Sequence, residues 1–152
     1  MILVFLKQFL KGWNEMALGF LGNLRASRLD AITTYAGNGA LLRLYSGTKP
    51  VTTGGTATTL LAELTCGTPF AGAANTSTGV LTLTVPISGT GASAAGAGTA
   101  ATWFRIVKAD GSTIVMDGTV GTASTDLIMP NTTIASGQPV QVTSFTITEA
   151  NT

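Results

Sequence analysis

The sequence contains no histidine, a single cysteine and few charges: Asp, Glu, Lys and Arg together make up 10% of its 152 residues. Without histidine, the usual Ser-His-Asp triad and Cys-His pair cannot form. The one cysteine, Cys66, cannot form an intramolecular disulfide, and its place in the apolar stretch LLAELTC predicts a small buried side chain. We therefore expect neither a disulfide-stapled fold nor a catalytic thiol.

Motifs for metal binding and acid–base chemistry are also missing. The seven acidic residues are widely spaced, so no metal-binding motif occurs. The closest pair, Asp110 and Asp117, precedes glycine in both cases, and Asp-Gly is a common turn signal. Neither glycine-rich stretch, residues 54–59 or 89–96, has the lysine and following helix of a phosphate-binding loop. We therefore expect a protein that is not an enzyme and has no catalytic, metal-binding or cofactor-binding residues.

The formal net charge is +1, and the lysines and arginines are scattered along the chain. A nucleic-acid-binding surface needs a basic stripe that neutralises phosphates, so nucleic acid is not an expected partner. Apolar residues make up 45% of the chain, and a weakly charged surface favours permanent contact with other subunits. We expect a subunit of an assembly; the alternative is a secreted, threonine-rich monomer.

The most hydrophobic segment is residues 1–22, which is interrupted by Lys7, Lys11 and Glu15. It has no uncharged run of the roughly 18 residues that a membrane-spanning helix needs. Its positive charges follow the apolar stretch, whereas those of a signal peptide precede it. The apolar residues recur at helical spacing and predict a short amphipathic helix. They are Ile2, Phe5, Leu6, Phe9, Leu10 and Trp13.

Such a helix needs a partner surface, which could be a neighbouring subunit, a groove on another protein or, with less support, a lipid interface. We favour an intersubunit contact and expect no membrane partner, because a short terminal helix has little core of its own. The alternative is that MALGFLG, beginning at Met16, is the natural start and residues 1–15 are an extension from an upstream initiation codon. The predicted interface residues are Phe5, Phe9, Trp13, Phe20 and Leu24.

A second helix is predicted over residues 21–35, where apolar side chains follow three- and four-residue spacing. These side chains are Leu21, Leu24, Leu29, Ile32 and Tyr35. Asn23 is the candidate N-cap of this helix. Gly37 and the Asn38-Gly39 pair supply left-handed residues that end it.

Beyond Gly39 the chain alternates short extended stretches with turn signals. In TWFRIVKADGSTIVMDG, residues 102–118, two strands are apolar on both faces and are joined at Asp110-Gly111, and a second Asp-Gly pair at 117–118 is expected to close the return arm. A hairpin of this kind is expected inside the fold. Trp103 is expected to pack in the core, with a glycan-binding or interface patch as the alternative.

Further strands are predicted over residues 40–46, 60–66, 80–88 and 139–148. Residues 46–59 are a predicted loop, and the Gly-Ser-Ala-rich residues 89–100 are a mobile loop or an arm against another subunit. Seven or eight strands with regular turn signals are typical of a mainly β fold, here a jelly-roll-like antiparallel β-sandwich. We expect an N-terminal helical segment or arm at residues 1–39 and the β-sandwich domain at residues 40–152.

Several segments of the sequence together resemble those of a family of small virion proteins of tailed bacteriophages. They are LLRLYSGTKPVTTGGTATTLLAELTCGTPFA, ATWFRIV, ADGSTIVMDGTVGT and VTSFTIT, with LDAIT at residues 29–33 in the helical start. The match runs from about Met16 to Glu149, and residues 1–15 have no counterpart in the family pattern. The resemblance is specific for the family and much less so for the role.

The resemblance implies a structural role as a capsid cement or decoration protein, a β-sandwich on the exterior of the icosahedral capsid of the virion. The implied partners are the major capsid protein and the chain itself, as a homodimer or homotrimer. The alternative is a receptor- or glycan-binding module associated with a tail, neck or fibre, with Trp103 and the Thr-rich loops as its binding surface.

Overall fold

The computed structural model describes residues 19–149 and is mainly β, as the sequence predicts, with one α-helix among these residues. The helix is α2 (Gly22–Ala36), and a 3-10 turn lies at Ser93–Ala95. The strands are β1 (Leu41–Tyr45), β2 (Leu60–Thr65), β3 (Val80–Thr82), β4 (Ile87–Gly91), β5 (Thr99–Ala100), β6 (Trp103–Val107), β7 (Ile114–Gly121), β8 (Leu127–Ile128), β9 (Thr133–Ile134), β10 (Pro139–Val142) and β11 (Thr146–Thr148).

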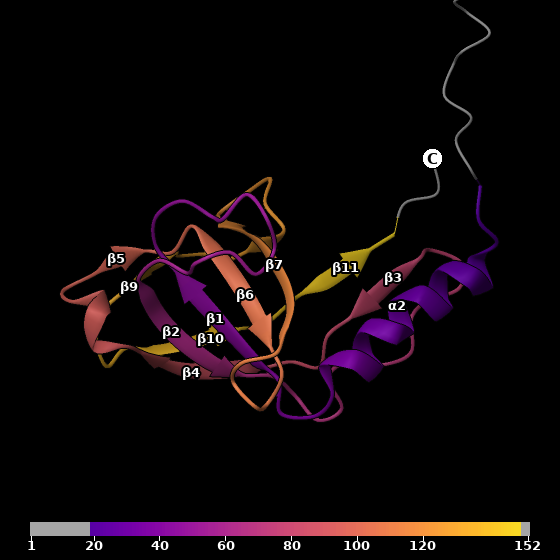
Figure 1. Cartoon of the computed structure of the whole chain (residues 1–152), viewed down its shortest axis with the longest axis horizontal. Coiled ribbons are helices and arrows are strands. Elements are labelled where there is room, and N and C mark those ends of the chain that lie inside the picture. The colour runs from indigo at the N-terminus through magenta and orange to yellow at the C-terminus, as the bar shows by residue number, and fades with distance from the viewer. Residues whose placement is uncertain (1–18, 150–152) are drawn as a thin grey trace, which may run out of the picture.

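Seven strands form one curled sheet in the order β10-β4-β2-β1-β6-β7-β8. Neighbours in it are antiparallel except for β7 and β8, which run parallel. Two small sheets, β11-β3 and β5-β9, complete the described part of the fold. Figure 1 shows α2 and β3 side by side at one end of the large sheet, with β11 leading from the sheet towards them.

Strand β6 is an inner strand of the large sheet and is buried, as the pattern of residues 102–118 predicts. All five of its residues are buried, because β1 and β7 pair with its two edges and the sheet curls around it. The turn at Asp110 is confirmed: its carboxylate accepts hydrogen bonds from the backbone N–H groups of Ser112 and Thr113, each at 2.7 Å. Gly111 takes the left-handed conformation there, with φ of 71°.

The second predicted turn, at Asp117-Gly118, is wrong. Strand β7 continues through both residues to Gly121, and Gly118 pairs with Phe104 on β6. A Cβ atom on Gly118 would lie 2.4 Å from Cε1 of Phe104, so this position needs glycine for a close approach across the sheet. The carboxylate of Asp117 is used in an ion pair instead of a turn.

The predicted helix over residues 21–35 is confirmed as α2, and Gly37, with φ of 72°, ends it by donating its N–H to the carbonyl of Thr33 at 3.1 Å. The predicted N-cap is wrong, because Leu21 occupies that position and no side chain caps the helix. The side chains that α2 buries are Arg25, Ala26, Leu29 and Ala36, whereas Leu21, Leu24 and Tyr35 are 76%, 49% and 51% exposed.

Arg25 explains which face of α2 is buried. Its guanidinium donates to the carbonyl of Thr78 at 3.0 Å through Nη2 and to the carbonyl of Glu149 at 3.0 Å through Nε. Both carbonyls lie at the same end of the β3–β11 sheet, next to the paired residues Val80 and Thr148. The hydrogen bonds therefore turn the Arg25 side of α2 towards this sheet, with Ala26 and Leu29 packed in the hydrophobic core beside it.

Three predicted stretches differ in the structure. Residues 80–88 form two strands instead of one, because Pro86 lies between β3 and β4, as expected of a strand end. Residues 139–148 split into β10 and β11, which belong to different sheets. Residues 89–100, predicted as a mobile loop or an arm against another subunit, are instead part of the fold. They contribute to β4, the 3-10 turn and β5, and Ala95 is 1% exposed.

Candidate interaction surface

The buried ionic groups of the described residues are used in structure. Arg105 and Asp117 form a two-bond ion pair across β6 and β7, with Nε–Oδ1 and Nη2–Oδ2 distances of 2.7 Å. Arg105 also donates to the carbonyl of Gly55 at 2.9 Å, and Asp117 accepts the N–H of Gly54 at 3.2 Å. The pair thus fastens the loop of residues 46–59 to the sheet and leaves no carboxylate free for acid–base chemistry there.

Trp103, the candidate for a glycan-binding or interface patch, is fully buried, so core packing is the correct interpretation. Its indole N–H donates to Oγ1 of Thr58 at 2.9 Å. Its ring stacks on Tyr45 with a centroid distance of 4.3 Å, and the Arg105 guanidinium carbon lies 5.3 Å from the ring centroid. The ring is therefore buried and held by neighbours within the protein.

Cys66 is buried, as predicted, and burial raises the pKa of its thiol to about 12. A thiol with so high a pKa stays protonated and unreactive at neutral pH. Among residues 19–149 no three His, Cys, Asp or Glu side chains lie close enough together to hold a metal ion. Asp110 is exposed, and its pKa is lowered by hydrogen bonds from Thr113 and Ser112, which keep it ionised as a turn residue.

The most prominent surface feature is an apolar stripe along α2. It consists of Leu21, Leu24, Arg28, Ala31 and Tyr35, which follow alternating three- and four-residue steps and so share one side of the helix. All five are exposed. Its single charged member, Arg28, is paired with Glu149 at 2.5 Å, so the stripe presents little unpaired charge.

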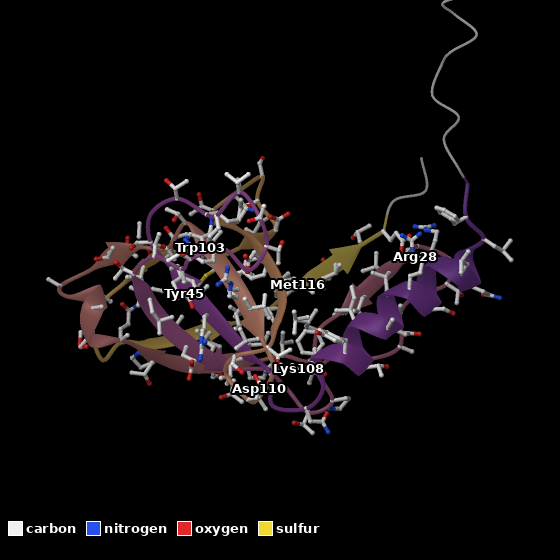
Figure 2. All side chains as sticks on the ribbon, in the orientation of Figure 1. Arg28, Tyr45, Trp103, Lys108, Asp110 and Met116 are labelled. Carbon is white, nitrogen blue, oxygen red and sulfur yellow. The ribbon has the colours of Figure 1, made fainter. Side chains whose placement is uncertain are left out.

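Beside this stripe lies a groove between α2 and β7. It is lined by Arg28, Ala31, Ile32, Tyr35, Val115 and Met116 and has a volume of about 380 Å³. The small side chain of Ala31 leaves room between the larger residues around it. At one end Nζ of Lys108 lies 3.9 Å from the ring centroid of Tyr35. Figure 2 shows Met116 and Lys108 where α2 meets the sheet and Arg28 farther along the helix.

The structure describes two of the five predicted interface residues. Leu24 belongs to the exposed apolar stripe, and Phe20, just before α2, is half-buried, with the Arg28 guanidinium carbon 5.0 Å from its ring centroid. The two residues therefore lie near each other at the start of the helix. Phe5, Phe9 and Trp13 lie outside the described residues, so the predicted helix at the N-terminus stays a prediction.

A second surface feature is a hollow between the two edge strands of the large sheet, β8 and β10, and the sequence does not predict it. The hollow, of about 390 Å³, lies between residues 126–130 around β8 and residues 141–146, which join β10 to β11. It adjoins another hollow beside Phe104, Met116 and β11. No local pattern marks these residues, since the two edges meet only when the sheet curls.

Comparison of the chain with protein-family models, with curated proteins and with solved structures finds no match in any of the three. Within the described residues, no helix is long and apolar enough to cross a membrane.

Proposed function

We propose that the chain is a non-enzymatic structural protein of a tailed-phage virion, which binds the exterior of the icosahedral capsid and cements or decorates it. This proposal is motivated by the resemblance of several sequence segments of the chain to small virion proteins of tailed bacteriophages. The observation that carries it is the exposed apolar stripe of α2 beside the α2–β7 groove, in a chain with few charges. An exposed apolar surface of this kind is typical of protein–protein contact sites.

The proposed partners are the major capsid protein and further copies of the chain, as a homodimer or homotrimer. The five predicted interface residues, Phe5, Phe9, Trp13, Phe20 and Leu24, would contribute apolar side chains to these contacts. Binding to the assembled shell alone would stabilise that state by mass action. Such a role needs a preformed surface and no catalytic group.

We also propose the finer architecture, a jelly-roll-like β-sandwich with residues 1–39 as a helical segment or arm and residues 40–152 as the β domain. The support is the curvature of the large sheet, whose end strands β8 and β10 border one hollow. A jelly roll has two packed four-stranded sheets, whereas the strands here form one sheet of seven and two of two. The jelly-roll topology therefore stays a prediction.

The alternative function is a receptor- or glycan-binding module on a tail, neck or fibre. Its proposed aromatic contact, Trp103, is buried, so only the Thr-rich loops are left for such a site. Copy number separates the two functions. A quantitative gel of purified particles should give hundreds of copies for a cement protein, and a few copies at one vertex would contradict our proposal.

The contact surface is tested by co-sedimentation of the purified protein with shells that lack it. Leu24→Asp should abolish co-sedimentation, because it places a charge in the apolar stripe while an acidic residue in the first helical turn suits α2. Ser27→Asp puts the same charge on the exposed polar side of α2 and should bind like the unmodified chain. Equal binding of both variants would contradict the assignment of this surface.

The N-terminal part of the interface needs its own variant. Deletion of residues 1–15 should weaken shell binding while the far-ultraviolet circular dichroism of the β domain is retained. Unchanged binding would remove Phe5, Phe9 and Trp13 from the proposed contact and would favour the interpretation of these residues as an extension.

A further inference from the structure

Strands β10 and β11 each have one paired edge and one open edge. Strand β10 pairs with β4, and β11 pairs with β3. No described strand pairs with the other side of either, because both are end strands of their sheets. Figure 1 shows the chain running on from β10 to β11, so the two open edges follow each other along one extended stretch.

The hydrogen bonds of β10 show which of its backbone groups point to the open side. The N–H of Gly91 donates to the carbonyl of Gln138 at 2.8 Å. Bonded and non-bonded residues alternate in an antiparallel ladder, so Val140 and Val142 also face β4. Gln141, between them, turns its N–H and C=O groups to the open side.

Strand β11 follows the same alternation. The N–H of Leu83 donates to the carbonyl of Phe145 at 3.0 Å, so Ile147, two residues further along, also faces β3. Thr146 and Thr148 therefore turn their backbone groups to the open side of β11.

Two more residues bring unpaired backbone groups to this region. The N–H of Met129 donates to the carbonyl of Gly121 at 2.9 Å, so in the parallel ladder Ile128 of β8 turns its own N–H and C=O away from β7. The Ile128 side chain is also 57% exposed. Thr143, just beyond β10, makes no backbone hydrogen bond within the described part of the chain.

All of these residues border the two hollows described above. Gln141 and Thr143 line the hollow of about 390 Å³, and Thr148 lines the adjoining one. Thr146 and Ile128 line both. The hollows thus lie between unpaired strand edges, which are templates for a further strand.

The sequence does little to protect these edges. Natural edge strands are commonly blunted by charged side chains or by proline. PVQVTSFTIT, residues 139–148, contains no charged residue, and its one proline stands at the start of β10. Its valine, isoleucine and threonine residues favour extended structure. Such an edge is suited to pairing with another strand.

We propose that an extended segment of a partner protein binds as an added strand between β8 and residues 141–148. Eight extended residues span about 26 Å. The buried members of the lining are all apolar: Phe104, Leu127, Met129, Val142 and Phe145. Because side chains alternate along a strand, the bound segment should carry apolar residues at every second position.

The charge of the lining adds a basic residue to this description. The two hollows are lined by Asp117 and Asp126 and by no lysine or arginine, and Asp117 is neutralised by Arg105. Oδ2 of Asp126 accepts both hydrogen bonds from Thr119, which leaves Oδ1 without a donor among the described residues. A lysine or arginine of the segment would pair with this oxygen.

A single strand of a partner is favoured over the edge of a second copy. The hollow is enclosed by β8 on one side and by residues 141–146 on the other, so its occupant must lie between them. A lone extended segment fits there, whereas β8 obstructs the approach of a folded sheet. The contact shares no residue with the apolar stripe of α2 and is independent of the capsid assignment.

Peptide selection on the full chain tests the proposal. The probe is a library of random ten-residue peptides displayed on yeast. Selected peptides should alternate apolar and polar residues and contain a lysine or arginine, and synthetic copies should bind the chain in solution. Failure to select any such peptide would overturn the proposal.

Two variants at one position test the backbone contact. Thr143→Pro should weaken binding of a selected peptide at least about tenfold, because proline removes the outward N–H while keeping an extended φ. Thr143→Ala removes the side chain, keeps the N–H and should bind like the unmodified chain. Equal affinities of the two variants would contradict strand addition.

The basic residue of the peptide has its own pair of variants. Asp126→Asn should weaken binding, and the affinity of this variant should depend less on salt concentration. Asp110→Asn changes the same charge on the turn between β6 and β7 and should leave binding unchanged. Equal affinities of these two variants would remove Asp126 from the contact.

Hydrogen exchange of the unmodified chain, followed by NMR, needs no substitution. In the free chain the amides of Gln141, Thr143 and Thr146 should exchange quickly and those of Val142 and Ile147 slowly. A bound peptide should slow exchange of the first group at least about tenfold, since its amides gain partners. Fast exchange of that group in the complex would contradict the proposed pairing.

The free chain supplies two further results that would overturn the proposal. Slow exchange of Gln141, Thr143 and Thr146 in the monomer would show that the chain itself already covers this edge. Slow exchange that becomes fast on dilution would assign the edge to a second copy.

Discussion

Arg105 faces Asp117 across β6 and β7 and donates two hydrogen bonds of 2.7 Å to its carboxylate, with the Asp117 side chain fully buried and that of Arg105 only 7% exposed. A buried charge without its partner is costly, so each of the two holds the other in place. Through Gly54 and Gly55 the same pair positions the long loop that precedes β2.

Removing the carboxylate should therefore destabilise the protein strongly. We expect Asp117→Ala to lower the free energy of unfolding by about 3–5 kcal/mol, because it leaves the Arg105 guanidinium buried and unpaired. The control is Glu63→Gln, which breaks the more exposed Arg43–Glu63 pair and should cost less than about 1 kcal/mol. Urea denaturation measures both, and similar losses in the two variants would contradict the structural role of the buried pair.

Gly118 should tolerate no side chain. Gly118→Ala places a methyl group 2.4 Å from Cε1 of Phe104, whose ring is also packed edge-on against Phe145 with 5.3 Å between centroids. Overpacking of this kind costs about 1–3 kcal/mol. In Gly72→Ala nothing lies within 4 Å of the added atom, and the midpoint of denaturation should hardly move.

Acid should destabilise the fold partly through Asp126. Hydrogen bonds from the N–H and hydroxyl of Thr119 lower the pKa of this carboxyl below its ordinary value of 3.8. A carboxyl with a lowered folded-state pKa stabilises the protein above its unfolded pKa, and this contribution is lost as the pH falls through the folded value.

The free energy of unfolding should thus decrease from about pH 4 downwards, in the range where unfolded aspartate takes up its proton. In Asp126→Asn the decrease should be shallower, since the substituted side chain does not titrate. Denaturation at a series of pH values from neutral to acid gives both curves, and parallel curves would exclude a role for Asp126.

The thiol of Cys66 should be protected in the folded state. Because burial raises its pKa to about 12, it should not react with a thiol reagent at pH 8 until the protein is unfolded. Counting labelled thiols with and without urea checks this. Rapid labelling of the native protein would mean that residues around Cys66 open readily.

The parts of the fold that the sequence predicts well depend on local patterns. The hairpin around Asp110 and the end of α2 at Gly37 follow from residues that are adjacent in the chain, and the structure has both. The Asp-Gly pair at 117–118 looks the same locally as the pair at 110–111. What distinguishes it is Arg105, which lies opposite Asp117 only after β6 and β7 have paired.

The surface of α2 is harder to predict for the same reason. Leucine spacing marks one side of the helix as apolar, but whether that side is buried depends on carbonyl groups far away in the sequence. Hydrogen bonds to the carbonyls of Thr78 and Glu149 hold Arg25 on the buried side of α2. Leu24 and Tyr35 therefore lie on its exposed side. The hollow between β8 and β10 likewise requires the curvature of the whole sheet, which no short window of sequence contains.

The hydrogen bonds of Arg25 also have a consequence for the order of folding. Arg25 and Glu149 are 124 residues apart in sequence, so during synthesis α2 is made long before the carbonyl of Glu149 exists. Until β11 has paired with β3, one of the two acceptors that hold Arg25 inside is missing, and α2 lacks its final anchor. Docking of the helix is therefore a late event in folding, because it depends on the pairing of β11 with β3.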